Sequence, residues 1–90
     1  MNLDDIRKQF IKIETERFNI INGYIKGIVK KEEIDRFEKA LLGFREDLYK
    51  FSCDDENILE IAKMKSKVQH FNTEILEDEE VLKIAYLNER

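Results

Sequence analysis

The stretch IDRFEKALLGFREDLYKF, residues 34–51, decides the fold. Large apolar residues recur in it at alternating intervals of three and four: Ile34, Phe37, Leu41, Phe44, Leu48 and Phe51. This spacing keeps one side of an α-helix apolar, and that side faces a neighbouring helix. We therefore expect a helix over about residues 32–52 whose apolar side packs into a core.

A second apolar stripe precedes this stretch. On a helical wheel it occupies roughly a third of the circumference, and its members are Leu3, Ile6, Phe10, Ile13, Ile20, Ile21, Tyr24 and Ile28. Asn22-Gly23 offers an early helix end, because glycine favours the residue after a helix. The stripe nevertheless continues beyond that pair, so we expect the first helix to reach about residue 29.

A third apolar period follows the acidic segment 52–56, whose residues suit a helix N-cap and first turn. Its members are Ile58, Ile61, Met64, Val68, Phe71 and Ile75. Val81, Ile84 and Ala85 fall on a different side of the same wheel, so the register changes near residues 76–80. A short terminal helix capped by Asp78 accounts for that change.

The composition fits one helical domain spanning residues 1–90. The chain has no proline, and it is 42% hydrophobic and 40% charged, as expected of helices with one buried side and one solvent-exposed side. We predict an all-α fold: an antiparallel three-helix bundle, or a hairpin, with a short C-terminal fourth helix. The alternative left open is a hairpin that completes its core by dimerising.

The chain also indicates its surroundings. Its first five residues include two aspartates and lack the basic start of a secretory signal. No stretch approaches the ~18 apolar residues of a membrane span. Cys53 is the single cysteine, so no intramolecular disulfide is possible. We expect a cytoplasmic protein with no membrane partner, in which Cys53 is half-buried at a helix end.

Extra apolar residues widen the first helix beyond what one neighbour covers: Ile11, Phe18, Ile25 and Val29. Leu42 and Tyr49 similarly lie away from the apolar side of the second helix. Two helices of the same bundle could flank the first helix and cover this width. Alternatively, these residues form a surface for self-association or for a partner protein.

Arg17 lies within the apolar arc of the first helix, where an isolated charge is costly to bury. We expect it to extend toward solvent or to pair with a carboxylate of a facing helix. The functional alternative is contact with an acidic group of a ligand or partner. Arg17 is thus a candidate for a buried ion pair or a ligand contact.

Catalytic and metal-binding motifs are missing from the sequence. It contains no phosphate-binding glycine loop, nucleophile elbow or EF-hand pattern, and His70 is its single histidine, expected on the polar face of the third helix. A di-iron bundle needs paired Glu-x-x-His motifs, and Lys67 stands where the glutamate before His70 would be. We expect no enzyme, no cofactor and no metal.

Two short segments, LDDIR at 3–7 and EIDR at 33–36, resemble parts of the small helical chorismate mutases. In that family, cationic side chains surround a dicarboxylate, so the resemblance implies such a role for the arginine of each segment. A further arginine of the family would fall at Tyr24, and a glutamate at Phe37. These departures remove the supporting chemistry, and the chain is not identified as a member.

Charge is uneven along the chain. Residues 1–31 hold seven basic and four acidic residues (net +3), residues 32–53 hold four and six (net −2), and residues 54–90 hold five and ten (net −5). Lysines cluster at 26–31 and 63–67, but residues two apart on a helix do not share a face. With a net charge of −4, direct nucleic-acid binding is not expected.

The sequence therefore favours a non-enzymatic protein-interaction module, such as an inhibitor, an adaptor or chaperone-like protein, or a small assembly subunit. Its partner would be another protein, itself in a homodimer, or both. One alternative is a small-molecule enzyme or ligand-binding bundle that uses Arg7, Arg17 and Arg36. Another is a small subunit of a nucleic-acid-associated complex.

Overall fold

The prediction of an all-α chain is confirmed. The computed structural model describes residues 2–89; Met1 and Arg90 lie outside the described residues. The helices are α1 (Leu3–Ile25), α2 (Lys31–Lys50), α3 (Ile58–Phe71) and α4 (Glu79–Leu87). A 3-10 turn, Asp55–Asn57, precedes α3, and a π-helical turn, Asn72–Leu76, follows it.

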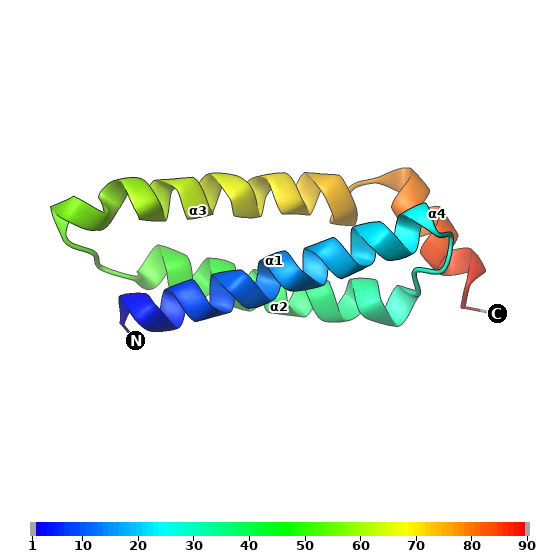
Figure 1. Ribbon diagram of the computed structural model, residues 1–90, viewed down its shortest axis with the longest axis horizontal. Helices are drawn as coiled ribbons and strands as arrows, with labels where there is room; N and C mark the ends of the chain where they lie inside the picture. The colour runs from blue at the N-terminus through cyan, green and yellow to red at the C-terminus, as the bar shows by residue number, and fades with distance from the viewer. Residues whose placement is uncertain (1, 90) are drawn as a thin grey trace.

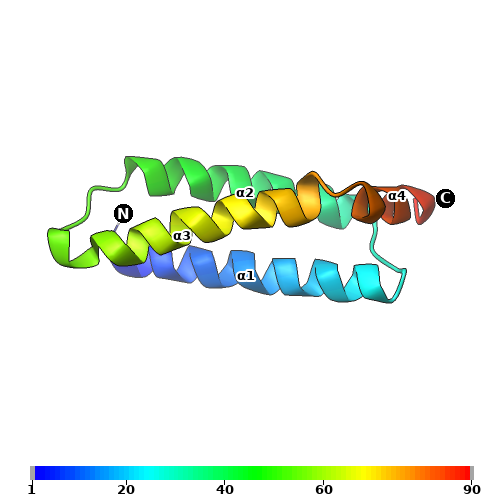
Figure 2. The same cartoon turned by 90° about the horizontal axis from the view of Figure 1, so that it is seen from above.

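Three long helices lie side by side along a molecule of 48 × 18 × 17 Å. Neighbours in sequence run antiparallel, as Figures 1 and 2 show. Short helix α4 lies at the end of the bundle where α1 connects to α2, and it contacts both of these helices. The opposite end holds the N-terminus and the connection from α2 to α3.

The core is built around the apolar side of α2. Its seam residues Ile34, Phe37, Leu41, Phe44 and Leu48 are at most 3% exposed. Phe51 follows the end of α2 and packs partly buried against this core. Residues from the other helices and from the α1–α2 connection complete the core within one copy of the chain: Ile6, Phe10, Ile13, Ile20, Val29, Ile61, Met64, Val68, Phe71, Ile75, Val81 and Ala85.

Helix α1 ends four residues earlier than the predicted residue 29. Gly27 adopts φ 73°, a left-handed conformation that glycine adopts without steric cost. The amides of Gly27 and Ile28 donate to the carbonyls of Tyr24 and Gly23, at 2.9 and 2.8 Å. These two bonds form a Schellman motif, which satisfies the last carbonyls of the helix. The main apolar row of the first helix therefore does not continue to residue 28. Ile28, expected in the core, is 61% exposed.

The start of α3 also differs from expectation. Ile58, predicted as the first core residue of this helix, is 52% exposed. Neither Asp54 before the 3-10 turn nor Asn57 before α3 caps with its side chain. Ile58 is the first residue of α3, and this end of α3 extends beyond the adjacent ends of α1 and α2, as Figures 1 and 2 show, so no neighbouring helix covers it. Cys53, in the connection before the 3-10 turn, is partly buried as expected.

The predicted change of register before the terminal helix is confirmed. The π-helical turn is wider than an α-helical turn, so it rotates the residues that follow it. Asp78 then caps α4 as predicted, since its carboxylate accepts hydrogen bonds from the amides of Glu80 and Val81 at 3.0 and 3.1 Å. At the other end of α4, the Asn88 side-chain amide donates to two carbonyls of the α1–α2 connection, both at 2.9 Å. The Asn88 bonds join the C-terminal end of α4 to the bundle.

Candidate protein-interaction surface

Three large apolar side chains project from α1 into solvent. Ile11, Phe18 and Ile25 are 62%, 60% and 73% exposed. They are seven residues apart, and seven residues fall only about 20° short of two full helical turns. They therefore form one row along the helix, which we call the α1 stripe.

Val29, the fourth residue expected on this surface, does not belong to it. It is fully buried, at 0% exposure. The chain turns back at Gly27, and the missing side chain of Gly23 leaves room for Val29, whose Cα and Cβ would lie 3.4 Å from a Cβ at that glycine. The turn thus moves Val29 from the outer side of α1 into the core.

The other two candidate interaction residues, Leu42 and Tyr49, lie on α2. Leu42 and Tyr49 are 49% and 66% exposed, so both are accessible. The ammonium group of Lys65 lies 4.9 Å from the centre of the Tyr49 ring, a cation–π geometry. Lys67, two residues further along α3, instead lies 5.6 Å from the Phe10 ring of α1. These lysines therefore do not share one basic face.

Arg17 pairs with a carboxylate of a facing segment, as the structural interpretation predicted. Its guanidinium donates to both oxygens of Glu74 in the π-helical turn, at 2.9 and 3.2 Å. It also lies 5.3 Å from the centre of the Phe71 ring. The side chains of the pair are 32% and 23% exposed, so the charge is neutralised at the edge of the core. His70, which is 71% exposed, lies 3.5 Å from the same carboxylate.

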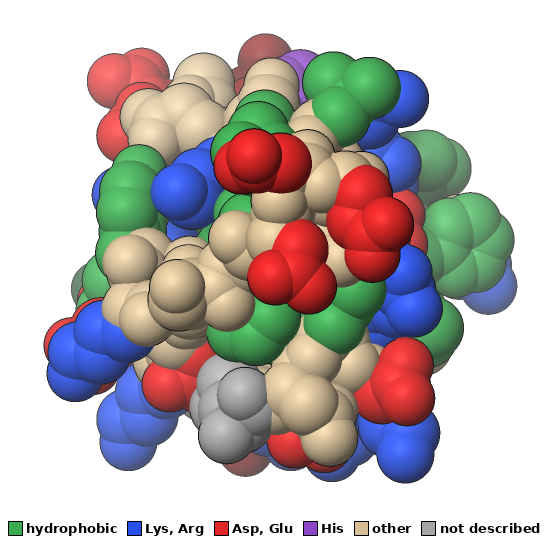
Figure 3. All heavy atoms as spheres, turned by 90° about the vertical axis from the view of Figure 1, so that its left-hand side faces the viewer, with side chains coloured by type: hydrophobic (Ala, Val, Ile, Leu, Met, Phe, Trp, Pro, Cys, Tyr) green, Lys and Arg blue, Asp and Glu red, His purple; other side chains and the backbone are tan. Residues whose placement is uncertain are grey.

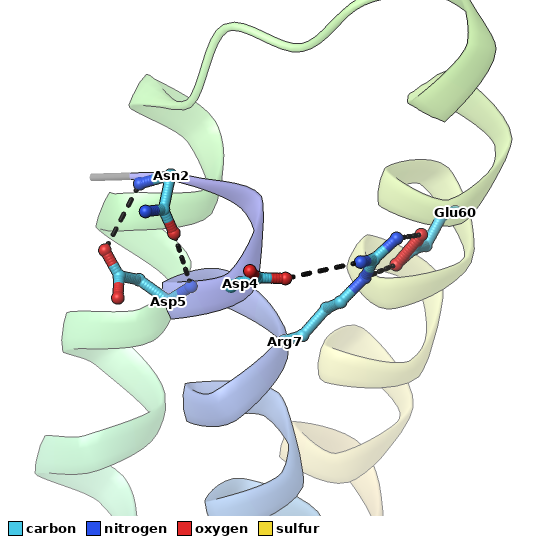
Figure 4. A network of polar contacts seen from close by, with 5 residues as sticks. All are labelled: Asn2, Asp4, Asp5, Arg7 and Glu60. Atoms are coloured by element: carbon cyan, nitrogen blue, oxygen red, sulfur yellow. Dashed lines mark hydrogen bonds and ion pairs between the residues drawn. The ribbon is translucent and has the colours of Figure 1, made fainter.

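Arg7 forms the corresponding link nearer the N-terminus (Figure 4). Its guanidinium reaches from α1 to α3 and donates to both oxygens of Glu60, at 2.7 and 2.8 Å. This hydrogen bond lowers the pKa of the Glu60 carboxyl and raises the pKa of Arg7. Nearby, Asn2 and Asp5 form a capping box that begins α1.

The three arginines proposed for a ligand site do not line one cavity. Arg7 and Arg17 are ten residues apart on α1, about 15 Å along its axis, and each binds a different carboxylate. Arg36 of α2 borders a separate shallow hollow with Glu16, Asn19, Ile20 and Glu33. The paired guanidinium groups are therefore engaged by the protein's own carboxylates.

A groove of about 550 Å³ lies between α2 and α4. Its apolar lining includes Ile34, Leu76, Leu82, Ala85 and Tyr86, and its charged lining comprises Lys31, Asp35, Glu38, Glu79 and Lys83. Sequence reasoning missed this feature, because it depends on where α4 docks. The sequence did hold one signal, because residues 79–87 contain more apolar side chains than one buried side of a short helix needs. Tyr86, for example, is 59% exposed in the structure.

Acidic side chains gather with hydrophobic ones at the end of the bundle that Figure 3 shows. This end holds the α2–α3 connection, with Asp54, Asp55 and Glu56 exposed. Within residues 2–89, no group of three or more His, Cys, Asp or Glu side chains is arranged to hold a metal ion. No helix in this range is long and apolar enough to cross a membrane.

Comparison with models of known protein families, with curated proteins and with solved structures gave no match.

Proposed function

We propose that this chain is a non-enzymatic protein-interaction module that docks through the apolar face of α1. The α1 stripe supports this proposal: three large apolar side chains, each at least 60% exposed, stand in one row on a surface helix. Amphipathic helices recognise partners through rows of this kind, which become buried in the complex. An inhibitor, an adaptor or chaperone-like protein, and a small assembly subunit all work in this way.

The α1 stripe binds another protein, a second copy of the chain in a homodimer, or each of these at different times. The seam residues of α2 are already buried within one copy. The proposal therefore assigns association to the α1 stripe rather than to completion of the core. Leu42 and Tyr49 form a second, smaller candidate contact. A cytoplasmic location belongs to the same proposal and is supported by the single free cysteine.

The test compares two double variants of exposed apolar residues. Phe18→Ser with Ile25→Ser removes most of the stripe, whereas Ile58→Ser with Leu59→Ser removes residues of similar exposure on α3 (52% and 66%). Both variants should keep the helical circular dichroism of the parent chain. Light scattering across protein concentrations gives self-association, and capture with the tagged chain, followed by titration of the purified captured protein, gives partner binding.

The expected result is that the α1 variant loses association and the α3 variant keeps it. If self-association and partner binding are both unchanged in the α1 variant, the stripe is not the docking surface. If the two variants lose binding equally, apolar exposure in general, rather than the row on α1, drives the association.

A further inference from the structure

We propose that the α1 stripe binds an amphipathic helix that carries acidic side chains along one edge of its apolar face. This inference rests on the proposed function, because it names the chemistry of the partner at the same surface. It is carried by two lysines on one edge of the stripe that form no ion pair within residues 2–89, although the whole chain has a net charge of −4.

Two lysines flank the stripe on one side. Lys8 and Lys26 are 18 residues apart, which is five full helical turns, so they lie on one line about 80° from the centre of the stripe. Lys26 is the C-cap residue of α1 and keeps a right-handed helical backbone conformation, with φ −82° and ψ −7°. Both side chains are exposed, and neither forms an ion pair with another residue in the range 2–89. Their charges are therefore available to a partner.

Most carboxylates near this surface are already engaged. Arg7 lies 3.5 Å from an oxygen of Asp4 and binds Glu60 through two hydrogen bonds. The carboxylate in the π-helical turn pairs with Arg17. Glu14, on the flank opposite the lysines, is the remaining carboxylate of this face of α1. The edge that holds the lysines is thus cationic, and it complements acidic side chains.

A second copy of the chain fits this edge less well. An antiparallel pair of α1 helices centred on Phe18 would set Ile11 against Ile25 of the other copy. The same pairing would bring Lys8 to within about 3 Å, along the helix axis, of the level of Lys26 from the other copy. Both lysine lines would then lie on the same edge of the dimer, and like charges would face each other at both ends of that edge, which is unfavourable. Carboxylates of an acidic helix would instead meet both lysines.

The dimensions define the partner helix. The stripe runs from Ile11 to Ile25, a rise of about 21 Å, and the two lysines are about 27 Å apart along the axis. A helix of about 18 residues spans both features. It would place apolar residues every three or four positions and aspartate or glutamate along one edge.

The probes are two synthetic 21-residue helical peptides with the same leucine seam. One carries glutamate and the other lysine at the positions that flank the seam, and binding is followed by the fluorescence anisotropy of a terminal fluorescein. We expect the lysine peptide to bind about tenfold more weakly, because each exposed ion pair changes affinity only a few-fold. The difference should shrink as salt is added.

Charge reversal supplies the matched variants. Lys8→Glu with Lys26→Glu should reverse the preference between the peptides. Lys39→Glu with Lys50→Glu, two exposed lysines of α2, changes the net charge by the same amount and should preserve it. Phe18→Ser should abolish binding of the glutamate peptide.

The remaining outcomes overturn the inference in distinguishable ways. Equal binding of both peptides that Phe18→Ser abolishes would keep the docking surface and reject the acidic partner. Binding that Phe18→Ser leaves unchanged would reject the surface itself. Failure of the glutamate peptide to bind, together with a dimer by light scattering that Phe18→Ser dissociates, would identify a second copy as the occupant. Failure without such a dimer would reject both the surface and the acidic helix.

Discussion

The guanidinium of Arg17 and the carboxylate of Glu74 form a two-point ion pair that joins α1 to the π-helical turn after α3. The contacts are 2.9 Å (Nη2–Oε1) and 3.2 Å (Nε–Oε2). The guanidinium also lies near the face of the Phe71 ring. A charge can therefore occupy the apolar arc of α1, because a partner neutralises it and an aromatic face covers one side.

This pair should contribute a measurable coupling energy. Arg17→Ala or Glu74→Ala alone should lower the free energy of unfolding by about 1–2 kcal/mol, since each leaves a partly buried charge without its partner. A double-mutant cycle in urea should give a coupling of about 0.5–1 kcal/mol. Lys31 and Asp35, an exposed pair at 3.5 Å, serve as the control and should couple close to zero. Equal coupling in the two cycles would contradict the structural role of Arg17.

The ion pair between Arg7 and Glu60 should make the free energy of unfolding depend on pH. The Arg7 hydrogen bond lowers the pKa of the Glu60 carboxyl in the folded state. A lowered pKa stabilises the fold above the ordinary glutamate value of about 4.3, and that contribution is lost as the pH falls through the lowered pKa. Urea midpoints at pH 7, 4 and 3 should fall less steeply in Glu60→Gln than in the parent chain. A parallel decline of both proteins would rule out this contribution.

Two glycines should respond in opposite directions to the same substitution. Gly27→Ala places a side chain at φ 73° and should destabilise the fold by about 1 kcal/mol. Gly43→Ala lies in the middle of α2, and apart from its chain neighbours and the backbone of the same helix no atom lies within 4 Å of the new Cβ, so it should stabilise by about 0.5–1 kcal/mol. Thermal unfolding followed by circular dichroism measures both. A loss of stability in Gly43→Ala would mean that its open side is occupied in solution.

The buried and exposed apolar residues should separate clearly in stability. Phe37 and Phe44 are 0% and 1% exposed, and truncation of either to alanine should cost about 3–5 kcal/mol. Because that loss can unfold a small domain, Phe37→Leu provides a milder variant with the same direction of effect. Ile28→Ala and Ile58→Ala should change stability by less than about 0.5 kcal/mol. Urea unfolding of all five variants tests this order, and near-wild-type stability of Phe37→Ala would overturn the core assignment.

Local periodicity determined a large part of this structure. The seam of residues 34–51 and the Asp78 cap follow from helical geometry and from hydrogen bonds within a few residues. Both could therefore be predicted from the sequence, together with the all-α class. The position of Ile11, Phe18 and Ile25 beside the main apolar arc was also predictable. Whether a neighbouring helix covers them was left open, and only the structure shows that they are exposed.

Only the tertiary structure decided the features that depend on residues far apart in the chain. The apolar pattern allowed α1 to end at Asn22-Gly23 or near residue 29, whereas the structure ends it at Ile25, and burial of Val29 against Gly23 accompanies the turn at Gly27. The pairing of Arg17 with Glu74 depends on how α1 approaches the segment after α3. The groove between α2 and α4 likewise exists only once α4 has docked. A sequence pattern shows which side of a helix is apolar, whereas packing decides which part of that side another helix covers.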